Sequence, residues 1–380
     1  MKGKISSSPP LYESRERRPG SRPLILMAAD FRLERELTDA LGRACGVLCG
    51  RATTALWLAL RAVRRRDGPG EVILPDILCA TVLDGVLLAG FTPIFADVVA
   101  GRLTPSADSV AQRITPRTRA VLVAHTFGCV ADIEAIRRAA PGIPILEDAV
   151  QGLGGHFRNQ PVGSLGDVSF VGFDHTKMIG GRGGALLFDD ASLLDGIEAD
   201  LGQLPDLSGL HLDTLNALDA LLPPAAAAAY AAQLRASASS LLRPFQVSPA
   251  NVNRIQADWQ TLRARVEARN AKARRLQARL SGLPLIVPDI REGDAIWRYT
   301  ITAPTAALAR RIMRGLQLAG LSGSGLYYPL SQFIGQPTAA GTLTNRLVNL
   351  WVDEATGDDE VRRAADVIAA VPWPRTFEKG

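Results

Sequence analysis

The chain has 380 residues, of which 47% are hydrophobic and 21% charged, and its formal net charge is +5. This length suggests two domains, and the composition is typical of a globular protein. The basic residues are scattered and only 6% of residues are aromatic, which argues against a nucleic-acid partner. The apolar run at 23–29 is too short for a signal peptide or a membrane span, so we expect a cytoplasmic protein without a membrane partner.

Residues 1–22 are polar, basic and rich in proline and serine, which predicts a disordered basic tail. Leucine spacing then predicts a helix at 31–41, followed by an apolar connection and a second helix within 50–63. Thr53 and Thr54 fall at the start of that second helix, where free N–H groups and the helix dipole favour an anion. The alternative is that the two threonines serve only as a helix cap.

The four cysteines lie in apolar stretches, and none of them forms a CxxC pair. They are Cys45, Cys49, Cys79 and Cys129. This pattern favours reduced, buried side chains in a cytosolic protein. A zinc site at Cys45 and Cys49 is the alternative, yet no nearby histidine or second cysteine pair completes four ligands, and we expect no metal.

Apolar runs typical of buried strands alternate with helical segments from residue 71 onward. The predicted strands are 72–74, 92–96, 120–124, 143–146, 168–173 and 185–188, and the predicted helices are 80–89 and 131–139. Continuous apolar strands indicate a sheet covered on both faces, which predicts a mostly parallel α/β domain over residues 23–250. Within it, 191–250 shows helical patterns without a chemical motif.

Residues 251–380 are predicted to form a linking helix and a small α+β domain. The expected elements are a long helix at 255–280, strands at 285–287 and 296–301, and helices at 306–318 and 358–370. Five arginines of the long helix are interpreted as a solvated face: Arg263, Arg265, Arg274, Arg275 and Arg279.

Two charged residues emerge beyond the predicted strands, Asp148 and Lys177. Ligands of parallel sheets bind at the carboxyl ends of strands. A pyridoxal 5'-phosphate (PLP) enzyme needs a lysine that binds the cofactor covalently and a carboxylate that stabilises the pyridine nitrogen. Taken singly, each residue is more simply explained as an exposed surface charge. The glycine run 180–184 precedes a strand, so it is a weak nucleotide-loop signal and more plausibly lets the lysine turn pass close to the cofactor.

The motifs EDAVQ at 147–151 and VGSLGDVSFVGFDHTK at 162–177 closely resemble the DegT/StrS family of sugar aminotransferases. The resemblance is strong over about residues 35–190 and thinner afterwards. It implies a fold-type-I PLP-dependent transferase, in which helices sandwich a mostly parallel seven-stranded-type central sheet and a smaller α+β domain follows. It also implies a homodimer with a shared active site.

The resemblance carries roles to individual positions. Lys177 matches the catalytic lysine and Asp148 the partner of the pyridine nitrogen. Gln151 matches a glutamine beside the cofactor's 3-hydroxyl, while Thr53 and Thr54 match the phosphate-binding turn.

Four positions depart from the family pattern. Cys79 stands where an aromatic ring usually stacks on the cofactor, and Gly172 where a serine usually binds its phosphate. Arg182 replaces an acid and could bind the phosphate or recognise an acidic substrate. Tyr327 replaces a histidine on the substrate side.

These features predict an aminotransferase that moves an amino group from an amino-acid donor to a keto group of a sugar nucleotide or related biosynthetic intermediate. Another PLP reaction on an amino acid (elimination, decarboxylation or condensation) stays open, because the departures surround the site. A catalytically weakened homologue with a structural or regulatory role is the third reading. Asn253 matches an asparagine contributed across the dimer, and an alignment shift of two residues would give this role to Asn251.

Overall fold

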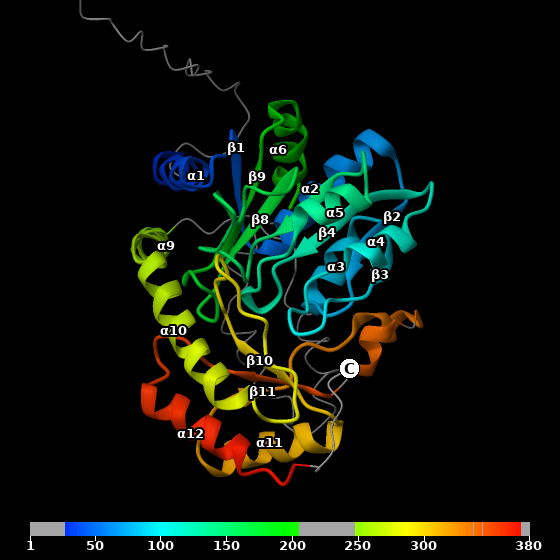
Figure 1. The fold of residues 1–380 in the computed structure, drawn as a ribbon. Coiled ribbons are helices and arrows are strands. Elements are labelled where there is room, and N and C mark those ends of the chain that lie inside the picture. The colour runs from blue at the N-terminus through cyan, green and yellow to red at the C-terminus, as the bar shows by residue number, and fades with distance from the viewer. Residues whose placement is uncertain (1–26, 205–247, 337, 344, 374–380) are drawn as a thin grey trace, which may run out of the picture.

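A computed structural model describes residues 27–204, 248–336, 338–343 and 345–373 (Figure 1). The predicted tail at 1–22 and the helical patterns within 205–247 lie outside the described residues. Because that gap adjoins the predicted domain boundary, the division into 23–250 and 251–380 stays a prediction. In the described ranges, no helix is both long and apolar enough to cross a membrane.

A seven-stranded sheet forms the centre of the molecule, in the order β1-β9-β8-β5-β4-β2-β3. Its strands are β1 Cys45–Cys49, β2 Glu71–Pro75, β3 Thr92–Ala96, β4 Thr118–Ala124, β5 Ile145–Asp148, β8 Val168–Phe173 and β9 Gly183–Phe188. β9 pairs antiparallel with both β1 and β8, and all other pairs in the sheet are parallel. The expected mostly parallel sheet is therefore confirmed.

Helices cover both faces of this sheet, as buried apolar residues on both faces of β2, β5 and β9 require. They are α1 Met27–Leu41, α2 Ala52–Asp67, α3 Ala80–Leu88, α4 Ala107–Arg113, α5 Ile133–Ala139 and α6 Leu194–Gly202. One core cluster joins α2, α3 and α6 to the sheet, and another joins α1, α4 and α5 to it. Capping side chains help to begin the short helices: Ser106 accepts from the Ser109 amide and Asp132 from the Ala135 amide.

Of the remaining helices, α10, α11 and α12 pack with a three-stranded sheet of order β10-β12-β11, whereas α9 lies beside α1 (Figure 1). Their bounds are α9 Pro249–Gln260, α10 Leu262–Leu280, β10 Tyr299–Thr302, α11 Ala306–Leu318, β11 Gly323–Ser324, β12 Leu347–Leu350 and α12 Asp358–Ala369. A separate cluster of buried side chains from α10, α11, α12 and the small sheet forms this core. The short elements are the hairpin β6 His156–Phe157 with β7 Gln160–Pro161 and the 3-10 turns Thr126–Gly128, Ala191–Leu193, Leu330–Ile334 and Ala339–Leu343.

Two predictions for the C-terminal part were wrong. The long helix at 255–280 is two helices that meet at Thr261, whose hydroxyl donates to the carbonyls of Ala257 and Asp258. Such back-bonding competes with helix continuation. The segment 285–287 forms only an isolated bridge between Ile286 and Thr302.

One strand was not predicted, and several strand boundaries differ from prediction. The expected connection after α1 is strand β1, which pairs with β9 through Val47 and Leu186. The predicted strand 143–146 is shifted, because the Ile143 amide donates to the Ala140 carbonyl instead of a ladder. The predicted strand 296–301 begins only at Tyr299, since the preceding residues bond elsewhere.

The segment 294–298 docks onto the turn 126–128 that follows β4. The Ala295 amide donates to the Gly128 carbonyl, and the Trp297 amide to the Phe127 carbonyl at 2.9 Å. A Cβ atom at Gly128 would lie 2.0 Å from the Ala295 carbonyl oxygen, so only glycine fits there.

A buried ion pair fixes the same joint. Arg102 donates to both carboxylate oxygens of Asp294, at 3.1 and 2.8 Å, and also to the Val130 carbonyl. The Asp294 carboxylate in turn accepts from the Val130 and Arg291 amides. The two charged residues are 4% and 2% exposed, and each is fully supplied with partners.

We expect Arg102→Met to lower the free energy of unfolding by about 3–5 kcal/mol, because it leaves the Asp294 carboxylate buried and unpaired. Arg263→Ala, which breaks the exposed i,i+4 pair with Glu267, should cost below about 1 kcal/mol. Denaturant unfolding of both variants measures the difference. Equal losses would show that the buried pair does not hold the joint.

Candidate active site

Asp148 and Lys177 lie at the same edge of the central sheet. Asp148 ends β5, and Lys177 follows the end of the neighbouring parallel strand β8 by four residues. Asp148 is buried and accepts one hydrogen bond from the Val150 amide, at 3.0 Å. Burial raises the pKa of Asp148 to about 6, although the nearby Lys177 charge favours the carboxylate.

Lys177 sits in a turn closed by its own amide, which donates to the Asp174 carbonyl at 2.9 Å. Its Nζ atom lies 4.1 Å from the ring centroid of Trp297, whose Nε1 donates to the Thr176 carbonyl. Burial lowers the pKa of Lys177, while the charges of Cys79, Asp174 and Asp148 oppose that shift. A lowered pKa raises the share of neutral amine at any given pH, and the neutral amine is the form that attacks carbonyl carbon.

Gln151 links the turn 126–128 to Tyr327. Its side-chain oxygen accepts from the Phe127 amide at 2.8 Å, and its side-chain nitrogen donates to the Tyr327 hydroxyl at 3.3 Å. Burial raises the pKa of Tyr327 well above its usual value, and contact with Cys79 and the charge of Asp148 add to the rise. The structure therefore brings five of the predicted residues together: Asp148, Gln151, Lys177, Cys79 and Tyr327.

Three aromatic rings form a stack beside these residues. The Phe127 ring lies parallel to Trp297 with centroids 6.3 Å apart, and it stacks on Tyr327 at 5.5 Å. Phe127 adopts a positive φ of 56° inside the turn 126–128. This uncommon conformation for a bulky residue is held by the hydrogen bonds of the same turn.

The start of α2 lies against the ends of β8 and β9. A Cβ atom at Gly172 would lie 3.0 Å from the Ala52 Cβ atom, and one at Gly184 would lie 2.7 Å from the Ala52 nitrogen. Thr53 and Thr54, the next residues of α2, are both buried, and Arg51 provides no side-chain cap. The first turn of α2 has no acidic residue, which suits an anion.

The glycine-rich turn after Lys177 packs against α9. Gly181 and Gly183 have φ values of 92° and 123°, which glycine adopts without strain. The amide and carbonyl of Arg182 both bond to the Asn251 side chain, at 2.8 and 2.9 Å. Arg182 and Asn253 are exposed, so neither reaches the residues around Lys177 through a described contact.

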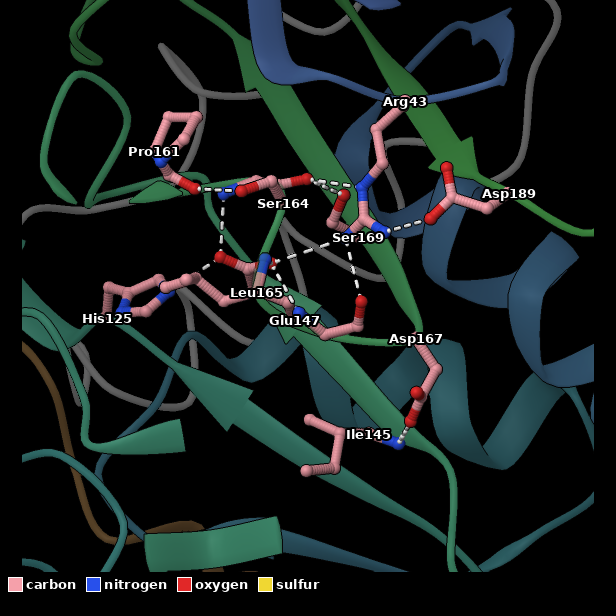
Figure 2. A network of polar contacts seen from close by, with 12 residues as sticks. Arg43, His125, Ile145, Glu147, Pro161, Ser164, Leu165, Asp167, Ser169 and Asp189 are labelled. Atoms are coloured by element: carbon pink, nitrogen blue, oxygen red, sulfur yellow. Dashed lines mark hydrogen bonds and ion pairs between the residues drawn. The ribbon is translucent and has the colours of Figure 1, made fainter. Parts of the chain in front are cut away.

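Glu147, the residue before Asp148 in β5, is the centre of a buried polar network (Figure 2). Its carboxylate accepts from the amides of Gly163, Leu165 and Gly166, at 2.6–2.9 Å, and Arg43 lies 3.7 Å away. Burial alone would raise the pKa of Glu147, but these donors and His125 outweigh it and lower the pKa.

His125 connects this network to the end of β4. Its Nδ1 atom accepts from the Ala131 amide at 3.0 Å, which leaves the proton on Nε2, 3.0 Å from the Glu147 carboxylate. A Cβ atom at Gly152 would lie 2.5 Å from the His125 Cβ atom, so the ring packs closely under the 149–152 turn.

Sequence reasoning missed five residues of this site. They are Phe127, His125, Glu147, Trp297 and Arg298, whose charge acts on Lys177. His125 directly follows a predicted strand, and that position was a usable signal. Trp297 and Arg298 lie far away in the sequence, inside a segment interpreted as a strand. As for the zinc alternative, no three metal-ligating side chains gather anywhere in the described ranges.

Comparison with known proteins agrees with this architecture. Residues 28–200 match the sequence model of the DegT/DnrJ/EryC1/StrS aminotransferase family. A UDP-N-acetyl-3-dehydro-alpha-D-glucosamine 3-aminotransferase of Acidithiobacillus ferrooxidans is 38% identical over 166 residues, which are 42% of this chain and 44% of that protein. An L-glutamine:2-deoxy-scyllo-inosose aminotransferase of Streptomyces fradiae is 35% identical over 170 residues, 44% of this chain and 40% of that protein. The chain thus matches less than half the length of these relatives.

Solved structures extend the likeness to most of the chain. The aminotransferase TlmJ from Streptoalloteichus hindustanus superposes with a TM-score of 0.74 at 23% identity, covering 90% of both chains. At this identity the likeness concerns the fold, which is that of fold-type-I aminotransferases. The resemblance to the DegT/StrS family indicated by the sequence motifs is confirmed for residues 28–200.

Proposed function

We propose that the protein is a PLP-dependent aminotransferase, which moves an amino group from an amino-acid donor to a keto group of a sugar nucleotide or related intermediate. The observation that carries the proposal is the placement of Lys177 and Asp148 on adjacent strand ends, each influencing the other's charge. The named relatives are aminotransferases acting on a UDP-sugar and on an inosose. Both substrates bear a ketone on a polyhydroxylated ring, which suggests the acceptor class.

The residues around Lys177 fit PLP. When bound, PLP supplies an electron sink next to the reacting carbon. Asp148 has a single hydrogen-bond donor among the described residues and a raised pKa, so it would gain from a protonated ring nitrogen. The α2 start with Thr53 and Thr54 would hold the phosphate, and Gln151 the 3-hydroxyl.

The departures at 79, 172 and 182 adjust rather than remove this site. Gly172 leaves room for the α2 start, because a serine Cβ atom would press on Ala52. Cys79 is half-buried and touches the Thr81 hydroxyl at 3.3 Å, so it offers a small soft face to the cofactor side. Arg182 is exposed and remains available for an anion near the turn.

Lys177 would act twice. Its Nζ atom would hold the cofactor covalently, and once a substrate amine had displaced it, the same atom would be free to accept the proton of the substrate Cα. The burial that lowers its pKa helps both roles, since both need a neutral amine.

We further infer a cytoplasmic homodimer in which Asn253 reaches the partner's site. This expectation rests on the family resemblance and on the exposure of Asn253 on α9, beside the turn that carries Lys177. We assign a different role to Asn251, because its side chain forms two hydrogen bonds with the backbone of Arg182 in its own chain.

We expect Lys177→Ala to abolish covalent PLP binding, because the chain then lacks the amine at this site. Wild-type protein given PLP should develop the visible band of lysine-bound cofactor, and borohydride should fix the cofactor to the peptide containing Lys177. Lys272→Arg, at the other lysine of the described ranges, should retain the band. Mass spectrometry localises the label, and a band that survives Lys177→Ala contradicts the assignment.

The rate of covalent PLP attachment should rise with pH and level off below 10.5, the ordinary pKa of lysine. The rate rises with pH because the neutral amine is the nucleophile. It levels off below 10.5 because burial lowers the pKa of Lys177. Asp148→Asn should move the plateau to still lower pH, because the Asp148 charge opposes the shift. Stopped-flow absorbance at saturating PLP measures both profiles; a wild-type rate still climbing at pH 10.5 would refute the lowered pKa.

A shared site can be tested by mixing two inactive variants. We expect Asn253→Ala to weaken PLP retention, and a mixed dimer with Lys177→Ala to regain one intact site, since Lys177 and Asn253 then come from different chains. Asn251→Ala serves as the matched control, because it should act within its own chain. Equilibrium dialysis measures PLP binding before and after subunit exchange. If PLP binding does not recover, Asn253 does not act in the partner's site.

A further inference from the structure

Arg298 is a buried cation close to the candidate site and has no role in the proposed chemistry. It is 7% exposed, and its guanidinium lies between two indole rings, 4.8 Å from the Trp297 centroid and 4.4 Å from that of Trp351. Indole faces hold a guanidinium plane by cation–π attraction. The arginine is therefore presented in a fixed orientation.

The position of Arg298 is fixed from the site side as well. Its amide donates to the Phe127 carbonyl at 3.3 Å, in the turn that also binds Gln151. The amino group of Lys177 lies over the ring of Trp297, the neighbour of Arg298 in the sequence. The charge of Arg298 disfavours the ammonium form of Lys177 and thereby helps to lower the pKa of Lys177, behind the larger effect of burial. The guanidinium and the reactive amine thus belong to one electrostatic environment.

Most N–H donors of the Arg298 guanidinium have no acceptor among the described residues. A guanidinium has five N–H donors. Within the described residues, only Nη1 is engaged, by Asp353 at 3.1 Å and by the Trp297 carbonyl at a long 3.5 Å. Asp353 also accepts from the Thr356 hydroxyl, so its carboxylate is shared. Nε and Nη2 have no protein partner there, and neither is among the fully buried side-chain atoms that lack one, so both keep accessible surface at which a ligand can bind.

Arg269 provides a contrast in the same part of the fold. It is 3% exposed, and its Nε and Nη2 atoms form a bidentate pair with the two oxygens of Glu354, at 2.9 and 2.8 Å. These are the same two atoms that Arg298 leaves open. Among the described residues, Arg269 leaves only its buried Nη1 without a partner, whereas in Arg298 the Nε and Nη2 pair that matches a carboxylate is open.

We propose that Arg298 binds the α-carboxylate of the amino-acid donor through Nε and Nη2. The planar fork of arginine matches a carboxylate, and the indoles of Trp297 and Trp351 keep the fork in place. The inference rests on the proposed function, because the donor would be held beside Lys177. It gives donor recognition to Arg298 rather than to Arg182, whose side chain is exposed.

The test compares two small amines that displace Lys177 from PLP and differ in a carboxylate. Aminooxyacetate carries one and methoxyamine does not, and both reactions are followed as loss of the visible band of the PLP-loaded protein. Arg298→Gln should slow the reaction with aminooxyacetate about ten- to one-hundred-fold, the range of a lost charge-assisted pair. The reaction with methoxyamine should be unchanged, which also shows that the variant is folded and loaded. Arg298→Lys should lie between, since it keeps the charge without the fork.

Arg291→Gln, at an exposed arginine paired with Asp289, is the matched control and should leave both rates unchanged. The inference is overturned if Arg298→Gln slows both amines equally, if it slows neither, or if Arg182→Gln alone shows the selective loss. A wild-type protein that never develops the band overturns the proposed function, and this inference with it. A normal band without selective loss overturns only the role of Arg298.

Discussion

The buried charge of Glu147 is the constraint on which the candidate site depends. Residues alternate across a strand, so Glu147 and Asp148 at the end of β5 face opposite sides. The Glu147 carboxylate accepts hydrogen bonds from three amides of the 163–166 loop. It also accepts one from His125, which follows the end of β4. Removing any donor would leave a charge in a dry interior. The same contacts therefore hold Asp148 in place and fix the turn 126–128 on which segment 294–298 rests.

How far the sequence predicts the molecule depends on how local each feature is. The strand Val168–Phe173 and the helix Ala306–Leu318 agree with prediction residue for residue, because their apolar patterns and flanking turns are local signals. The start of β10 was misplaced since Trp297 and Arg298 donate to Phe127, a partner more than one hundred residues away. The break at Thr261 needs only a hydroxyl turned back onto its own helix, which apolar spacing does not reveal.

The same distinction applies to the site. Lys177, Asp148 and Gln151 could be found because each lies in a short motif at a strand end. Phe127, Trp297 and Arg298 could not, because their importance comes from tertiary contacts between the turn after β4 and the segment before β10. His125 lies between these cases: its position after a strand was visible, whereas its bond to Glu147 required the fold.

The substitution at position 79 gains a physical meaning from these contacts. The Cys79 thiol lies against the Tyr327 hydroxyl, which Gln151 also contacts. An aromatic ring at position 79 would extend into the space of that hydroxyl, so cysteine at 79 and tyrosine at 327 are compatible where two rings would compete. Aromatic surface is instead supplied by the stack of Phe127, Trp297 and Tyr327. The surroundings of Lys177 thus have aromatic faces beside Cys79, and these faces lie next to a buried arginine with open donors.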